Sequence, residues 1–128
     1  MSKTPEYQYV LYIDEAGDDG LRRVRPIDEN GATEWLVVSG VLVRQSNEDQ
    51  CSEWVKGIRK DIAAEQSSTI HYRKLSPKKQ ERATELLATK PVRVFTVCSN
   101  KKNMRGYRNV RAEIAGGKQW FYNWVVRI

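Results

Sequence analysis

The sequence predicts one α/β domain over residues 1–128, with helices packed on a mixed sheet of mainly three strands. Three apolar segments at 7–13, 35–43 and 92–98 are rich in β-branched and aromatic residues and have the length of strands. Between the second and the third, apolar residues recur at helical spacing, which predicts helices on the sheet. The 40% hydrophobic and 30% charged residues are typical of a globular protein and exclude a disordered or collagen-like chain.

The first predicted strand, YQYVLYI at 7–13, runs into the acidic segment DEAGDDG at 14–20, which predicts a turn. In the polar stretch that follows, residues 28–31 are a candidate for the tip of a hairpin. Within the second strand, at 35–43, Gly40 indicates a bulge or a close backbone approach. Both strands are almost continuously apolar, so we expect them to be covered on both faces.

Two helices are predicted before the third strand. The first follows the N-cap candidates Ser46 and Asn47 and continues to about residue 64. The second begins at Ser76, which a proline follows, and Pro91 stops it. The apolar positions of these helices are Cys51, Trp54, Val55, Ile58 and Ile62 in the first and Ala83, Leu86 and Leu87 in the second.

A last helix is predicted from Lys118 to Ile128, with no C-cap glycine and no polar end. Its apolar face consists of Trp120, Phe121, Trp124, Val125 and Ile128. Two interpretations stay open. Either this face docks within the chain, or the chain is the front part of a longer fold. In a competing hypothesis the face packs against another chain, as in a homo-oligomer.

Charge is distributed unevenly along the chain. Residues 1–64 hold 8 basic and 12 acidic side chains, a net of −4, whereas residues 65–128 hold 14 basic and 4 acidic ones, a net of +10. Such asymmetry favours a polyanionic partner, because clustered Lys and Arg attract phosphates; a solvated basic face is the alternative.

The sequence also predicts where the protein works. No apolar run approaches the ~20 residues that cross a bilayer, and the N-terminus lacks the apolar stretch of a signal peptide. With only Cys51 and Cys98, a disulfide framework is not expected. We therefore expect a cytoplasmic protein with no membrane partner.

Four carboxylates, those of Asp14, Glu15, Asp18 and Asp19, lie within six positions at the end of the first predicted strand. Carboxylates before a glycine turn can share one hard cation, such as Mg²⁺ or Mn²⁺. Neighbouring strand residues point to opposite faces, so Asp14 and Glu15 are not expected to bind one ion together. Asp14 with Asp18 or Asp19 is the more plausible pair. An acidic turn that caps backbone groups is the structural alternative.

His71 is the only histidine, and it precedes Tyr72, Arg73 and Lys74 at the start of the basic half. A histidine in this setting can bind metal, carry a proton or contact a phosphate. An ordinary surface or packing residue is the alternative. No zinc-ligand spacing is present, because the cysteines and this histidine are widely separated.

The segment KKNMRGYRNVR at 101–111 has five basic side chains with Tyr107 among them. This mixture predicts contact with a nucleic-acid strand, because Lys and Arg bind phosphate and tyrosine stacks on a base. A mobile basic loop is the alternative. Arg22, Arg23 and Arg25 closely follow the acidic turn and could place a phosphate near a metal ion there. The candidate nucleic-acid contacts are Lys101, Lys102, Arg105, Tyr107 and Arg108.

The string YIDEAGD at 12–18 resembles the opening signature of the family called domain of unknown function 3800. WLVVSGVLV, the amphipathic helix after it, Ile70-His71 before a helix and VCSNKKN follow in order and strengthen the resemblance. Members of that family look like ribonuclease H-like folds and are suspected metal-dependent nucleases. The resemblance implies roles for Asp14, Glu15, Asp18 and His71. It covers about the front half of the usual family domain, before the later strand and acidic residue that complete the metal site.

The sequence therefore predicts the N-terminal part of a longer ribonuclease H-like domain that hydrolyses nucleic-acid phosphodiesters with Mg²⁺ or Mn²⁺. In this hypothesis Asp14 is the central metal ligand, Asp18 is a second ligand, and Glu15 is a supporting or alternative ligand. His71 orients phosphate or water. The alternative is a non-catalytic or incomplete domain that binds nucleic acid or a protein partner.

Overall fold

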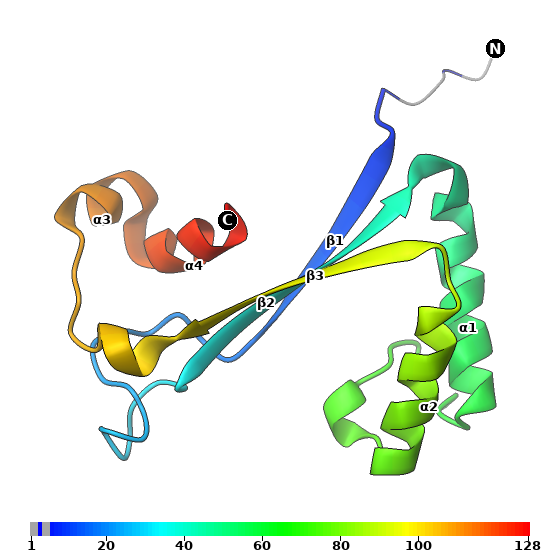
Figure 1. Cartoon of the computed structure of the whole chain (residues 1–128), viewed down its shortest axis with the longest axis horizontal. Helices are drawn as coiled ribbons and strands as arrows, with labels where there is room; N and C mark the ends of the chain where they lie inside the picture. Colours follow the sequence, from blue (N-terminus) through cyan, green and yellow to red (C-terminus); the bar gives the residue numbers. More distant parts are fainter. Residues whose placement is uncertain (1–2, 4–5) are drawn as a thin grey trace. The chain divides into compact units, whose positions relative to one another are not determined.

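The computed structural model describes residue 3 and residues 6–128. Its strands form one sheet in the order β1-β2-β3, and helices follow β2 and β3 (Figure 1). The strands are β1 (Tyr9–Ala16), β2 (Trp35–Arg44) and β3 (Val92–Asn100). The helices are α1 (Cys51–Asp61), α2 (Pro77–Ala88), α3 (Val110–Gly116) and α4 (Trp120–Val126). Short 3₁₀ helices span Gln45–Gln50, Tyr72–Lys74, Lys101–Met104 and Gly117–Gln119.

The predicted α/β class is confirmed, but the sheet is antiparallel, whereas the sequence predicts a mixed one. Two contacts fix the register of β2 against β3. The hydroxyls of Ser39 and Thr96 lie 3.2 Å apart, and the Lys101 N–H donates to the Glu34 carbonyl at 2.8 Å. The two position numbers have the same sum in both pairs, as antiparallel strands require. Each strand pairs with the next one in the chain, so no parallel crossover arises.

The chain divides into two compact units. Unit 1 consists of Met1–Leu11 and Leu42–Arg93, and unit 2 consists of Tyr12–Val41 and Val94–Ile128. In unit 1, α1 and α2 lie side by side (green in Figure 1). Their contact buries Ile58, Ile62 and Ala83, which are positions that the helical spacing predicts.

The core of unit 2 joins the sheet to the last helix. Leu36 and Val38 of β2 are buried against Phe121 and Val125 of α4, together with Leu21 from the β1–β2 connection. The predicted apolar face of the final helix therefore docks partly within this chain. Trp124 and Ile128, in contrast, are 61% and 78% exposed, so their role in association with another chain stays a prediction.

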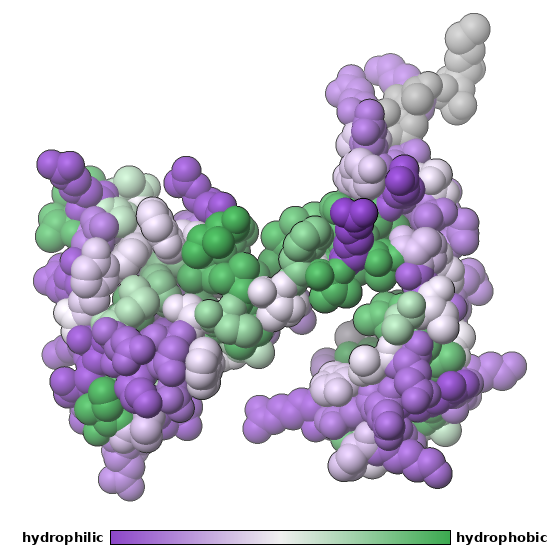
Figure 2. Space-filling model, viewed as in Figure 1, coloured by the Kyte–Doolittle hydropathy of each residue, from purple (hydrophilic) through white to green (hydrophobic). Residues whose placement is uncertain are grey.

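The expectation that both early strands are covered on both faces is wrong for β1. All of its residues except Val10 are exposed, including Leu11 and Ile13. The reason is topological: β1 is an outer strand of the described sheet, whereas the central strand β2 buries every second residue along most of its length. Hydrophobic surface is accordingly visible over the strands (Figure 2).

Local signals predicted some element ends and missed others. Ser76 is the N-cap of α2 with Pro77 in its first turn, as predicted. The predicted caps Ser46 and Asn47 lie instead inside a 3₁₀ helix that precedes α1. Helix α3 was not predicted; the Asn109 side chain caps it by accepting from the Ala112 N–H at 3.0 Å. In the described part of the chain, no helix combines the length and apolar character that crossing a membrane requires.

Candidate functional site

The four residues of the acidic cluster, Asp14, Glu15, Asp18 and Asp19, flank a sharp turn at Gly17, directly after β1. Gly17 has φ +87°, and a Cβ there would collide with the Trp35 carbonyl oxygen. Thr33 closes the turn, because its hydroxyl donates to that carbonyl at 2.9 Å and accepts from the Asp18 N–H at 3.0 Å. The end of β1 is thereby fixed to the start of β2, which determines where the carboxylates lie.

Three of the four predicted carboxylates, those of Glu15, Asp18 and Asp19, line one cavity of about 390 Å³. We call it the acidic cavity. Gln119 and Tyr122 from the C-terminal segment complete its wall. The turn and the last helix, more than 95 residues apart in the sequence, thus meet at one site of unit 2.

Tyr122 links the last helix to the end of β1. Its hydroxyl donates a hydrogen bond to Glu15 Oε2 at 3.3 Å. Burial raises the pKa of Tyr122, and the negative charges of Glu15 and Asp14 raise it further. The hydrogen bond therefore places the Glu15 carboxylate beside the last helix. The Asp14 Oδ1 atom also accepts from the Glu15 N–H at 2.9 Å.

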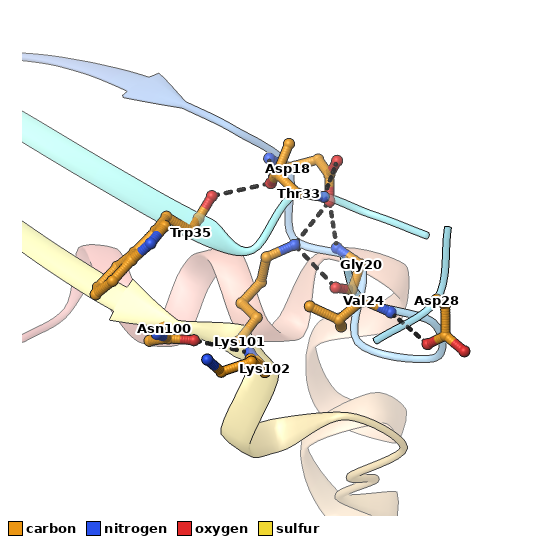
Figure 3. A network of polar contacts seen from close by, with 9 residues as sticks. All are labelled: Asp18, Gly20, Val24, Asp28, Thr33, Trp35, Asn100, Lys101 and Lys102. Atoms are coloured by element: carbon orange, nitrogen blue, oxygen red, sulfur yellow. Dashed lines mark hydrogen bonds and ion pairs between the residues drawn. The ribbon is translucent and has the colours of Figure 1, made fainter. Parts of the chain in front are cut away.

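Asp18 has a different partner, the fully buried Lys101 (Figure 3). The Lys101 ammonium donates to Asp18 Oδ1 at 2.8 Å and to the Gly20 carbonyl at 2.9 Å. Asp18 Oδ1 also accepts from the Gly20 N–H, and Oδ2 accepts from the Thr33 N–H. One acceptor position on Oδ2 is left for anything else.

The environment of Asp18 favours its charged form. Burial acts to raise the pKa of this carboxyl, but the hydrogen bonds from Lys101, Thr33 and Gly20 outweigh it, so the pKa is lowered. A buried ammonium needs a counter-charge, and Asp18 supplies it. Asp18 therefore serves first as the internal partner of Lys101.

The loop between β1 and β2 is held by a second ion pair. The Arg105 guanidinium binds Asp28 in a bidentate manner, with N–O distances of 2.6 and 2.7 Å. Asp28 Oδ2 also accepts from the Val24 N–H at 2.9 Å. The Asp28 N–H bonds back to the Val24 carbonyl, and the Gly31 N–H bonds to the Asp28 carbonyl, so a turn forms where residues 28–31 predict one.

Unit 2 is expected to lose stability as the pH falls below about 4. Hydrogen bonds from Arg105 and Val24 hold the pKa of Asp28 far below its usual value in the folded chain. The unfolded chain therefore takes up a proton at a higher pH than the folded chain does. The stabilisation is complete above the usual aspartate pKa and is lost as the pH falls below it.

Urea denaturation at a series of pH values checks this prediction. Asp28→Asn should flatten the acid-side loss of stability. Glu29→Gln removes a neighbouring carboxylate that forms no ion pair in the described part of the chain, and it should keep the wild-type profile. An unchanged profile in Asp28→Asn would contradict the account.

Of the five residues predicted to contact nucleic acid, four form ion pairs with carboxylates and one is a half-exposed tyrosine. Lys101 is buried inside unit 2 with its ammonium on Asp18, so we leave it out of the nucleic-acid surface as a correction to the sequence-based assignment. Lys102 lies 3.4 Å from Glu34, and Arg105 is held by Asp28. Arg108 pairs with Glu113 at 2.7 Å, whereas the Tyr107 ring is half exposed.

His71 belongs to unit 1, whereas the acidic cavity belongs to unit 2. It is exposed and is the N-cap residue of the 3₁₀ helix Tyr72–Lys74, and its carbonyl accepts from the Lys74 N–H at 2.9 Å. It contributes no side chain to the acidic cavity. Its role in orienting phosphate or water stays a prediction from the sequence.

Two residues of the site were missed by sequence reasoning. The sequence predicts a surface position for Lys101, although this residue directly follows the strand that ends at Asn100, where a side chain can point inward. Tyr122 lies among the apolar residues of the last helix, and its position in the sequence does not indicate a polar partner. Neither residue carries a local signal, since each meets its partner across a long sequence separation.

Carboxylate oxygens are ligands that Mg²⁺ and Mn²⁺ prefer. Within residues 6–128 and residue 3, no three His, Cys, Asp or Glu side chains form a group arranged to hold a metal ion.

Comparison with known family models, curated proteins and solved structures gave no match to this chain.

Proposed function

We propose that the chain hydrolyses phosphodiester bonds of nucleic acid, using a Mg²⁺ or Mn²⁺ ion held at the acidic cavity of unit 2. One observation carries the proposal: the cavity gathers the carboxylates of Glu15, Asp18 and Asp19 beside Tyr122, and Asp14 directly precedes Glu15 in β1. Carboxylates concentrated at a concave site suit a hard cation and the phosphate that it attracts.

In the proposal, Asp14 is the central ligand of the ion, Glu15 is the supporting or alternative ligand that lines the acidic cavity, and Asp18 supports the site. Asp18 moves to this supporting role because Lys101 and two backbone N–H groups already occupy most of its acceptor positions. Tyr122 keeps the Glu15 carboxylate directed by its hydrogen bond. A bound divalent ion would activate water and neutralise the scissile phosphate.

The fold supports this proposal at a coarse level. A three-stranded antiparallel sheet whose first strand ends in the acidic cluster is compatible with a ribonuclease H-like fold. The ribonuclease H-like assignment and the resemblance to the family of unknown function both stay part of the proposal.

A cleavage assay tests the proposed function. The purified chain is incubated with a fluorescently labelled single-stranded oligonucleotide and Mn²⁺, and the products are separated on a denaturing gel. Cleavage is expected with Mn²⁺ and is expected to stop when EDTA removes the ion. Cleavage that persists in EDTA, or no cleavage of DNA or RNA under any metal condition, would overturn the proposal.

A further inference from the structure

A second cavity, of about 590 Å³, lies in unit 2 and shares a wall with the acidic cavity. Asp19 lines both. Residues 20–22 line the second cavity directly after the acidic turn. On the other side, Lys118 and Trp120 line the second cavity while Gln119, between them, lines the acidic one. The same two chain segments thus build both cavities, which makes them neighbours.

One wall of the second cavity is aromatic. Tyr107 is 51% exposed, and its ring centroid lies 6.2 Å from that of Trp120. Trp120 packs in turn against Phe121 at 5.7 Å, and Phe121 is buried in the core of unit 2. The Trp120 ring is therefore anchored, whereas the Tyr107 ring keeps a face open to solvent. An open aromatic face is what an unpaired base stacks on.

The second cavity is lined by three cations, Arg22, Arg108 and Lys118, and by the carboxylates Asp19 and Glu113. Arg22 and Lys118 line it, both are exposed, and neither forms an ion pair within the described residues. Arg108 also lines it, but its guanidinium is held by Glu113. Two cations beside an aromatic wall match the phosphate and the base of one nucleotide.

We infer that the second cavity binds one nucleotide of a single-stranded nucleic acid, with its base on Tyr107 and its phosphate at Arg22 and Lys118. The inference rests on the proposed function and names its substrate class. A duplex is disfavoured because pairing and stacking cover the base faces that the aromatic wall needs. The shared wall at Asp19 places the adjoining phosphate of the strand at the acidic cavity.

Binding is measured by fluorescence anisotropy with a labelled single-stranded deoxyadenosine decamer in EDTA, so that no cleavage is needed. Tyr107→Ala should weaken binding roughly tenfold, because base stacking is lost. Tyr107→Phe keeps the ring and should bind as wild type does. A decamer of the same length without bases should bind weakly, and the Tyr107→Ala change should not alter its affinity.

The phosphate contacts are tested by the salt dependence of the same binding. Arg22→Ala and Lys118→Ala should each lower the slope of log affinity against log salt by about 0.7. Arg127→Ala removes the same charge at a position that lines neither cavity, and it should keep the slope. Equal affinity in Tyr107→Ala and wild type, or equal affinity for duplex and single strand, would overturn the inference.

The outcomes separate this inference from the proposed function. If binding of the decamer depends on the Tyr107 ring but no Mn²⁺-dependent cleavage occurs, the nucleotide site holds and the nuclease proposal is wrong. If cleavage depends on Mn²⁺ but the Tyr107, Arg22 and Lys118 variants bind the decamer with the affinity of the unmodified chain, the nuclease proposal holds and the nucleotide site is wrong.

Discussion

Asp14→Asn is expected to reduce Mn²⁺-dependent cleavage at least about 100-fold, since the loss of a charged ligand removes several kcal/mol of transition-state stabilisation. The substitution is close to isosteric. Its amide oxygen can still accept the Glu15 N–H that Asp14 Oδ1 accepts, so the end of β1 should keep its structure. Initial cleavage rates of the labelled single strand, measured at saturating Mn²⁺, check this prediction.

Two variants control for the position of the charge. Glu15→Gln should also lose cleavage, because this carboxylate lines the acidic cavity. Asp49→Asn makes the same chemical change as Asp14→Asn in unit 1 and should cleave as wild type does. If Asp14→Asn cleaves at the wild-type rate, Asp14 is not a metal ligand in the reaction.

Asp18→Ala is expected to destabilise unit 2 by about 3 kcal/mol. The reason lies in its partner, because Lys101 is fully buried and would keep an ammonium without a counter-charge. We take the lower end of the usual range for such a loss, since the Asp18 side chain is itself 49% exposed. Urea denaturation followed by tryptophan fluorescence measures it, because Trp35, Trp120 and Trp124 lie in unit 2.

A double-mutant cycle separates the buried charge from the other contacts of Asp18. Lys101→Met replaces the ammonium by an apolar side chain of similar volume, so the Asp18→Ala/Lys101→Met pair should be more stable than Asp18→Ala alone. Asp19→Ala, which removes the neighbouring carboxylate, is the control and should cost below about 0.5 kcal/mol. A double variant that is no more stable than Asp18→Ala would contradict the buried-charge explanation.

Local patterns in the sequence predicted the elements whose stability is local or periodic. The apolar repeat of α1 identified Ile58 and Ile62, and Ser76 with Pro77 identified the start of α2. The apolar pattern of β1, in contrast, did not predict how far this strand is buried. An apolar strand has the same sequence pattern whether or not another element covers it, and coverage depends on neighbours elsewhere in the chain.

In the candidate site, too, the sequence predicts contacts between neighbouring residues but not contacts between residues far apart in the chain. The acidic cluster and the turn at Gly17 are contiguous in the sequence, so their proximity was predictable. The partner of Asp18 lies 83 positions away and the partner of Glu15 lies 107 positions away. No local pattern tells a lysine that enters the core from one that binds phosphate, because the two differ only in tertiary surroundings.

The central claim, that the carboxylates at the end of β1 hold a divalent ion, is tested most directly by calorimetric titration of Mn²⁺ into the chain and into Asp14→Asn. The account predicts a saturable heat for the unmodified chain and its loss in the variant. An absence of saturable heat in the unmodified chain, or the same heat in both proteins, would contradict it.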